Sequence, residues 1–76
     1  MTEADAALIA TLRAWMEDVM AHRQWSAEHW AREAGIAGTT ITRFFKDPER
    51  AIPATKTLWK MQWAAGIPII LYRRKS

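Results

Sequence analysis

The stretch from residue 25 to residue 46 carries its own start and stop signals for two short helices, and these signals constrain the fold most. Ser26 is a good N-cap, because its hydroxyl can accept a hydrogen bond from a free backbone N–H of the helix that follows. Gly35 can adopt the left-handed conformation that ends this helix. A second helix, near residues 38–46, should stop where Asp47 precedes Pro48, since proline disfavours helical backbone at the residue before it.

Both helices have an apolar side that can face a common core. Helical spacing assigns to the core Trp30, Ala31 and Ala34 of the first helix and Ile41, Phe44 and Phe45 of the second. The outer side of the second helix then carries small polar and basic residues: Thr39, Thr42, Arg43 and Lys46. Two helices joined by a turn of three or four residues that contains Gly form a helix-turn-helix, a motif that places its second helix in the major groove of DNA.

The sequence resembles the lambda-repressor-like (Cro and XRE type) family of bacterial and phage DNA-binding domains over residues 8–68. The resemblance is carried by the stretch 57–68, which is similar to that family's next helix and its end, and by five residues of the predicted motif: Ala31, Gly35, Ile36, Ile41 and Phe44. In that family the second helix of the motif lies in the major groove. The resemblance therefore implies base contacts from Gly38, Thr39, Thr42 and Arg43.

The chemistry of these side chains suits base recognition. The Arg43 guanidinium can donate two hydrogen bonds to guanine, and Thr39 and Thr42 offer hydroxyl and methyl groups. Residues near both ends of the motif can bind the phosphate backbone, as commonly happens around a groove-reading element. The predicted phosphate contacts are Arg23, Ser26, Thr40, Lys46, Arg50 and Lys56.

The charge is distributed unevenly along the chain. Residues 1–37 contain six acidic and three basic residues, a net charge of −3, whereas residues 38–76 contain two acidic and eight basic residues, a net charge of +6. The basic half begins with the predicted DNA-reading helix. This arrangement is expected if that side of the molecule meets a polyanion.

Two further helices should flank the motif. Thr2 can cap a long amphipathic helix that ends near Ala21 or His22, and another helix should run from Ala54 or Thr55 to Gly66. The sequence thus predicts an all-α fold, a compact bundle of four to five short helices. Residues 1–68 would form the DNA-binding domain and residues 69–76 a tail.

The tail leaves two alternatives open. Residues 69–72 favour an extended strand that would pair with a second copy, but a short fifth helix packed on the first helix fits equally well. Trp59 and Trp63 lie on a face of their helix offset from its core side, where they can cap the core edge or contact another subunit. The predicted dimer interface is Trp59, Trp63, Ile69, Ile70, Leu71 and Tyr72.

Other classes of function find little support in the sequence. The chain has no cysteine, which excludes disulfides and thiolate metal sites and fits a cytoplasmic protein. His29 and Glu33 lack a third metal ligand, and no nucleophile or phosphate-binding glycine loop is evident, so we expect no enzyme, metal, cofactor or small-molecule ligand. No apolar run is long enough to span a membrane.

We therefore expect a sequence-specific regulator of transcription, a small repressor that binds double-stranded DNA as a homodimer. The alternative is a protein-interaction module, such as an antitoxin or regulatory adaptor, that uses the same fold to bind a partner protein.

Overall fold

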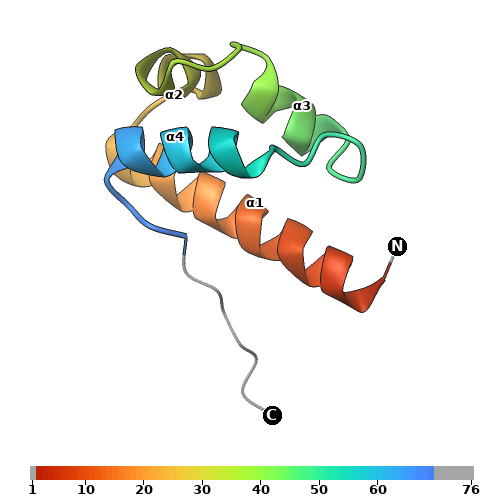
Figure 1. The fold of residues 1–76 in the computed structure, drawn as a ribbon. Helices are drawn as coiled ribbons and strands as arrows, with labels where there is room; N and C mark the ends of the chain where they lie inside the picture. The colour runs from red at the N-terminus through yellow and green to blue at the C-terminus, as the bar shows by residue number, and fades with distance from the viewer. Residues whose placement is uncertain (1, 70–76) are drawn as a thin grey trace.

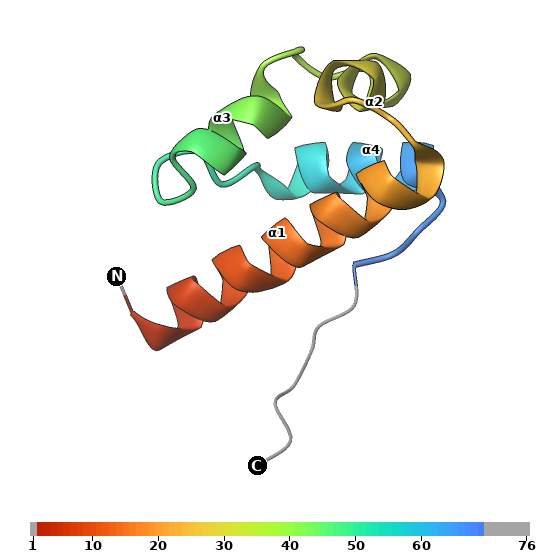
Figure 2. The ribbon, with the colours of Figure 1, turned by 180° about the vertical axis from the view of Figure 1, so that it is seen from behind.

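Four α-helices account for most of residues 2–69, the part of the chain that this computed structural model describes (Figure 1). They are α1 (Glu3–Arg23), α2 (Ala27–Ala34), α3 (Thr40–Lys46) and α4 (Thr55–Ala65). No strand occurs within residues 2–69, so the all-α prediction is confirmed. In both views α1 runs along one side of the molecule, and α2 and α3 lie together on the opposite side (Figures 1 and 2).

Local capping explains where three of the helices begin or end. Thr2 forms a capping box with Asp5, whose backbone N–H lies 3.1 Å from the Thr2 hydroxyl oxygen. Ser26 caps α2 by accepting a hydrogen bond of 3.1 Å from the backbone N–H of His29. Gly35 and Gly66 end α2 and α4 in the left-handed conformation, each with φ of 69°. These caps agree with the sequence prediction.

Two helix boundaries differ from the prediction. α1 continues to Arg23, past the expected end at Ala21 or His22. Gln24 then takes the left-handed conformation, with φ of 56°, and closes the helix. α3 begins at Thr40, not near residue 38, because Thr39 makes no side-chain cap and Gly38 belongs to the preceding turn. The turn between α2 and α3 consequently spans residues 35–39, longer than the three or four residues expected.

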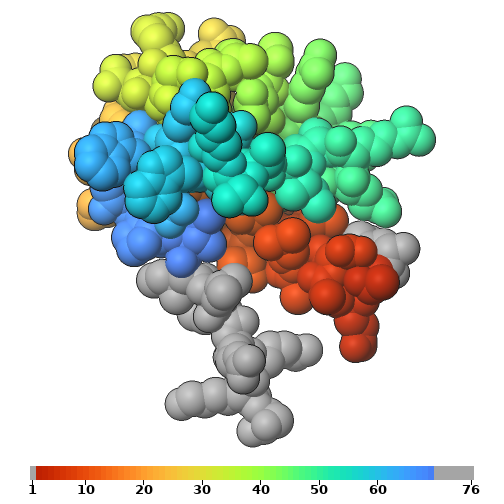
Figure 3. Space-filling model, in the orientation of Figure 1, coloured from red at the N-terminus to blue at the C-terminus, as the bar shows by residue number. Residues whose placement is uncertain are grey.

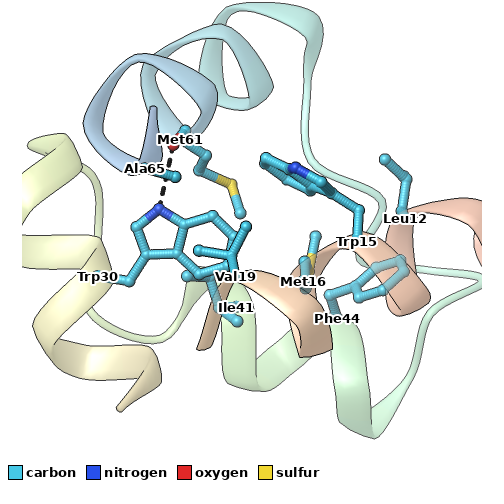
Figure 4. Close-up of a cluster of buried hydrophobic side chains, with 9 residues drawn as sticks. All are labelled: Leu12, Trp15, Met16, Val19, Trp30, Ile41, Phe44, Met61 and Ala65. Carbon is cyan, nitrogen blue, oxygen red and sulfur yellow. Dashed lines mark hydrogen bonds between the residues drawn. The ribbon is translucent and has the colours of Figure 1, made fainter. Parts of the chain in front are cut away.

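A single cluster of buried side chains from all four helices forms the core (Figure 4). Within it, Trp15 of α1 and Trp30 of α2 meet edge to face, with ring centroids 5.1 Å apart. The indole N–H of Trp30 donates to the Met61 carbonyl at 3.1 Å, and that of Trp15 donates to the Ile67 carbonyl at 2.9 Å. Both polar groups of the core tryptophans are therefore satisfied, and each bond ties another segment to α4 or to the residues just after it.

The chain after α4 is fixed to the body of the protein as far as residue 69. The Arg23 guanidinium donates two hydrogen bonds to the Ala65 carbonyl, at 3.0 and 2.6 Å, and so caps the C-terminal end of α4. The backbone N–H of Ile69 donates to the Gln62 side-chain oxygen at 3.0 Å. The predicted strand or fifth helix begins at Ile69, which lies in no helix or strand, and its remaining residues, 70–76, lie outside the described residues.

None of the helices described is both long enough and apolar enough to cross a membrane.

Candidate nucleic-acid interface

The core holds α3 in a fixed orientation. Ile41 and Phe44 are fully buried in the cluster shared with Met16 and Val19 of α1 (Figure 4). Phe45 is half-buried, and the Arg13 guanidinium lies over its ring at 5.4 Å from the centroid. A cation over an aromatic face is attracted by the ring quadrupole, so this contact adds a second link between α1 and α3.

The opposite side of α3 faces solvent. Thr42, Arg43 and Lys46 are exposed, and so are Gly38 and Thr39 in the turn that precedes the helix. Ile41 and Phe44 are three positions apart and share the buried side of α3, so Thr42, Arg43 and Lys46 point to other sides of the helix. All four residues predicted to contact bases are therefore exposed, on α3 or in the turn before it. Together with Lys46 we call them the α3 face: Gly38, Thr39, Thr42, Arg43 and Lys46.

The hydrogen bonds within the α3 face limit what each side chain can offer. The Thr42 hydroxyl donates to the Thr39 carbonyl at 3.1 Å, so it retains an acceptor oxygen and a methyl group for an external contact. The Thr39 hydroxyl makes no capping bond and can both donate and accept. Arg43 takes part in neither of the ion pairs found within residues 2–69, which leaves its guanidinium open to an external acceptor.

A hollow of about 520 Å³ lies between α2 and the α3 face. Its lining adds three residues that the sequence analysis did not assign to the site, Glu28, Arg32 and Ile36, to Gly38, Thr39 and Thr42. Glu28 and Arg32 are four positions apart on α2, so helical spacing could have paired them. That they meet the turn before α3 follows only from how the two helices pack.

Three of the residues predicted to contact phosphates are exposed and lie at the end of α3 or after it: Lys46, Arg50 and Lys56. Arg50 has an ion pair with Asp47, with 3.8 Å between Nε and Oδ2, and both side chains are largely exposed. Such a surface pair contributes little stability, so a phosphate can compete for the guanidinium. The loop between α3 and α4 also carries two exposed acids, Asp47 and Glu49, so these bases are interspersed with negative charge.

The other predicted phosphate contacts are partly occupied within the molecule. Ser26 uses its oxygen to cap α2 but keeps its O–H hydrogen for donation. Thr40 is half-buried at the first position of α3. Arg23 caps α4 and lies over the ring of Trp25, 5.5 Å from the centroid, so its principal observed role is structural. None of these contacts tests the phosphate prediction, which stays a prediction for all three.

Two tryptophans predicted at a dimer interface are strongly exposed. Trp59 is 63% and Trp63 is 80% exposed, and their ring centroids lie 6.4 Å apart. The space-filling view shows side chains of α4 standing out on the face below α2 (Figure 3). Ile69 is half-buried, whereas the predicted interface residues Ile70, Leu71 and Tyr72 lie outside the described residues.

His29 and Glu33 form a partly exposed pair on α2, with 3.8 Å between His29 Nε2 and Glu33 Oε2. Within residues 2–69 no group of three or more histidine or acidic side chains comes together.

Comparison with protein-family models, with curated proteins and with solved structures finds no match to this chain.

Proposed function

We propose that this chain is a sequence-specific double-stranded DNA-binding module, a small cytoplasmic repressor of transcription that belongs with the lambda-repressor-like domains its sequence resembles. The α3 face would lie in the major groove, with Arg43 bound to guanine and Thr39 and Thr42 contacting neighbouring base edges. Lys46, Arg50 and Lys56 would bind phosphates on either side.

The observation that carries this proposal is the two-sidedness of α3. Its apolar side is fully buried at Ile41 and Phe44, whereas Thr42 and Arg43 are exposed on its other sides and Thr39 is exposed in the turn before it. A helix anchored in this way has a fixed orientation, and a groove-reading element requires such a helix with its polar side chains exposed.

The first measurement is affinity for DNA. The full chain is used to select duplexes from a random-sequence library, and binding of the selected duplex is compared with that of a shuffled duplex of equal composition. We expect the selected duplex to bind more tightly, with affinity for both falling steeply between about 50 and about 200 mM salt. Failure to bind any duplex would exclude the proposed function.

Arg43→Ala and Lys56→Ala provide a matched pair, because each removes one positive charge from an exposed side chain. Lys56→Ala should weaken binding evenly on both duplexes and lower the salt slope by about one. Arg43→Ala should reduce affinity for the selected duplex by about tenfold to a hundredfold more than for the shuffled one, since only base contacts carry sequence information. An equal loss on both duplexes would refute the role of Arg43.

Arg43→Lys separates charge from hydrogen-bond geometry. Lysine keeps the positive charge but lacks the planar fork that bonds two acceptors of guanine. We expect this variant to retain the salt slope of the unaltered protein and to lose preference for the selected duplex. Retention of full preference would show that Arg43 acts only as a charge.

The second candidate function is a protein-interaction module, favoured by the exposure of Trp59 and Trp63. These residues do not belong to the α3 face, so the two functions predict different sensitive positions. A protein partner that binds through α4 would be lost on replacing the tryptophans and unaffected by Arg43→Ala.

A further inference from the structure

The exposed face of α4 combines the exposed rings of Trp59 and Trp63 with two shallow hollows that are open to solvent. A hollow of about 440 Å³ is lined by Trp59 and Trp63 together with Gln62, Gly66 and Pro68. A second hollow, of about 390 Å³, is lined by the same two tryptophans together with Glu33, Ala34 and Lys60. We call this combined surface the tryptophan face.

We propose that the tryptophan face is a twofold self-association surface and that its occupant is a second copy of this chain. Projecting indoles and apolar hollows lie next to one another on a single face. In a twofold dimer the same patch of both copies meets, so each copy's rings can enter the hollows of the other. A surface that offers both the inserting group and the receiving space is suited to such an arrangement.

The charges at the edge of the tryptophan face support the same occupant. Glu33 and Lys60 are both exposed and line the same hollow, and neither one's charge dominates. A twofold axis brings a residue of one copy to its counterpart position on the other, so Glu33 can face Lys60 of the second copy twice. A strongly acidic or strongly basic partner would instead find one of these charges repulsive.

The exposed area of the two tryptophans sets the expected strength of the dimer. With 63% and 80% of their surfaces exposed, the two tryptophans present roughly 300 Å² of mostly apolar surface in each copy. A standard interface buries about 800 Å² per partner, so the surrounding residues must supply the remainder. We therefore expect a reversible dimer and not an obligate one, with the tryptophans as its energetic centre.

This inference is separate from DNA binding, because neither hollow of the tryptophan face includes a residue of α3. The test is sedimentation analysis of the full chain over a concentration series with no DNA present. A monomer–dimer equilibrium is expected. A chain that stays monomeric at the highest soluble concentration would overturn the proposal and leave the tail or another protein as the occupant.

Trp63→Gln should raise the dissociation constant of the dimer by at least about tenfold, as for a central interface residue. The matched control is Leu8→Gln, which makes a comparable apolar-to-polar change at a residue of α1 that is 38% exposed and lines neither hollow. Circular dichroism verifies that both variants fold. Equal dissociation constants for the two variants would contradict the proposal.

Exchanging the charges of Glu33 and Lys60 tests specifically whether the occupant is a second copy of the chain. Glu33→Lys and Lys60→Glu should each weaken the dimer, because each places like charges opposite one another. The double variant restores opposite charges across the twofold axis and should recover the dissociation constant of the unaltered chain. A double variant as weak as either single one would overturn the twofold pairing.

Discussion

Gly35 and Gly66 end α2 and α4 in the left-handed conformation with the same φ of 69°, but in different surroundings. A Cβ added at Gly35 would meet nothing within 4 Å. A Cβ added at Gly66 would lie 3.0 Å from Nη2 of Arg23, the atom that donates the 2.6 Å hydrogen bond to the Ala65 carbonyl. The two positions therefore separate the cost of left-handed backbone from the cost of disturbing Arg23.

We expect Gly35→Ala to lower the free energy of unfolding by about 1 kcal/mol, the cost of a left-handed conformation for a residue with a Cβ. Gly66→Ala should lower it further, by up to about 1 kcal/mol, because the Arg23 guanidinium must shift and its charge-assisted hydrogen bond to the Ala65 carbonyl is weakened. Urea unfolding of both variants, each repeated with Arg23→Ala, completes a double-mutant cycle. The difference between the two glycines should vanish once Arg23 is removed; if it persists, Arg23 is not its cause.

For single residues, the sequence predicted contacts between neighbours along the chain and missed contacts between residues far apart along the chain. Ser26 as a cap of α2 and Gly35 as its end could be predicted, because both depend on backbone within a few residues. The bond between Arg23 and Ala65 joins residues 42 positions apart and depends on where α1 and α4 end relative to one another. Nothing in the local pattern distinguishes Arg23 from a solvated arginine.

Among the helices, α2 is held to α4 by one buried polar contact. Trp30 is fully buried, and its indole N–H donates to the Met61 carbonyl (Figure 4). Trp25, just before α2, is only half-buried, and its ring stacks on His29 at 5.2 Å between centroids. These two tryptophans therefore form a natural comparison for the same substitution.

Trp30→Phe should lower the free energy of unfolding by about 2 kcal/mol, since it leaves a cavity and removes the hydrogen bond to α4. Trp25→Phe should cost less than about 1 kcal/mol, because a half-buried ring can be replaced with less loss of packing. Urea unfolding followed by far-UV circular dichroism measures both. Similar losses in the free energy of unfolding for the two variants would mean that the buried hydrogen bond and packing of Trp30 contribute no more than the half-buried ring of Trp25.

The helices themselves were predictable because each has a strong local signal and a consistent apolar side. The residue at which α3 begins was less predictable, because Gly38, Thr39 and Thr40 are weak helix formers and no side-chain cap marks the first residue. The packing of Ile41 and Phe44 decides where the helix becomes stable. The exposure of Thr42 and Arg43 was nevertheless predictable, since it depends on the helical period and not on the boundary.

For the whole molecule, the uneven charge, the α3 face and the tryptophan face divide the surface into regions with different proposed partners. The sequence indicated both faces but not that two hollows flank the tryptophans, because their walls come from α2, from α4 and from the residues after it. If both proposals hold, one twofold dimer carries two α3 faces. Linking two binding modules raises overall affinity without any new DNA contact, as long as both can engage at once.

This linkage predicts how Trp63→Gln should affect DNA binding. On a duplex with two copies of the selected sequence about one helical turn apart, Trp63→Gln should lower affinity by about a hundredfold, because the two modules no longer act together. On a duplex with a single copy it should leave affinity unchanged, since no α3 residue is altered. Arg43→Ala should lower affinity for both duplexes. Equal losses on one-copy and two-copy duplexes for Trp63→Gln would show that the tryptophan face does not join the modules that read DNA, even if the chain dimerises through it.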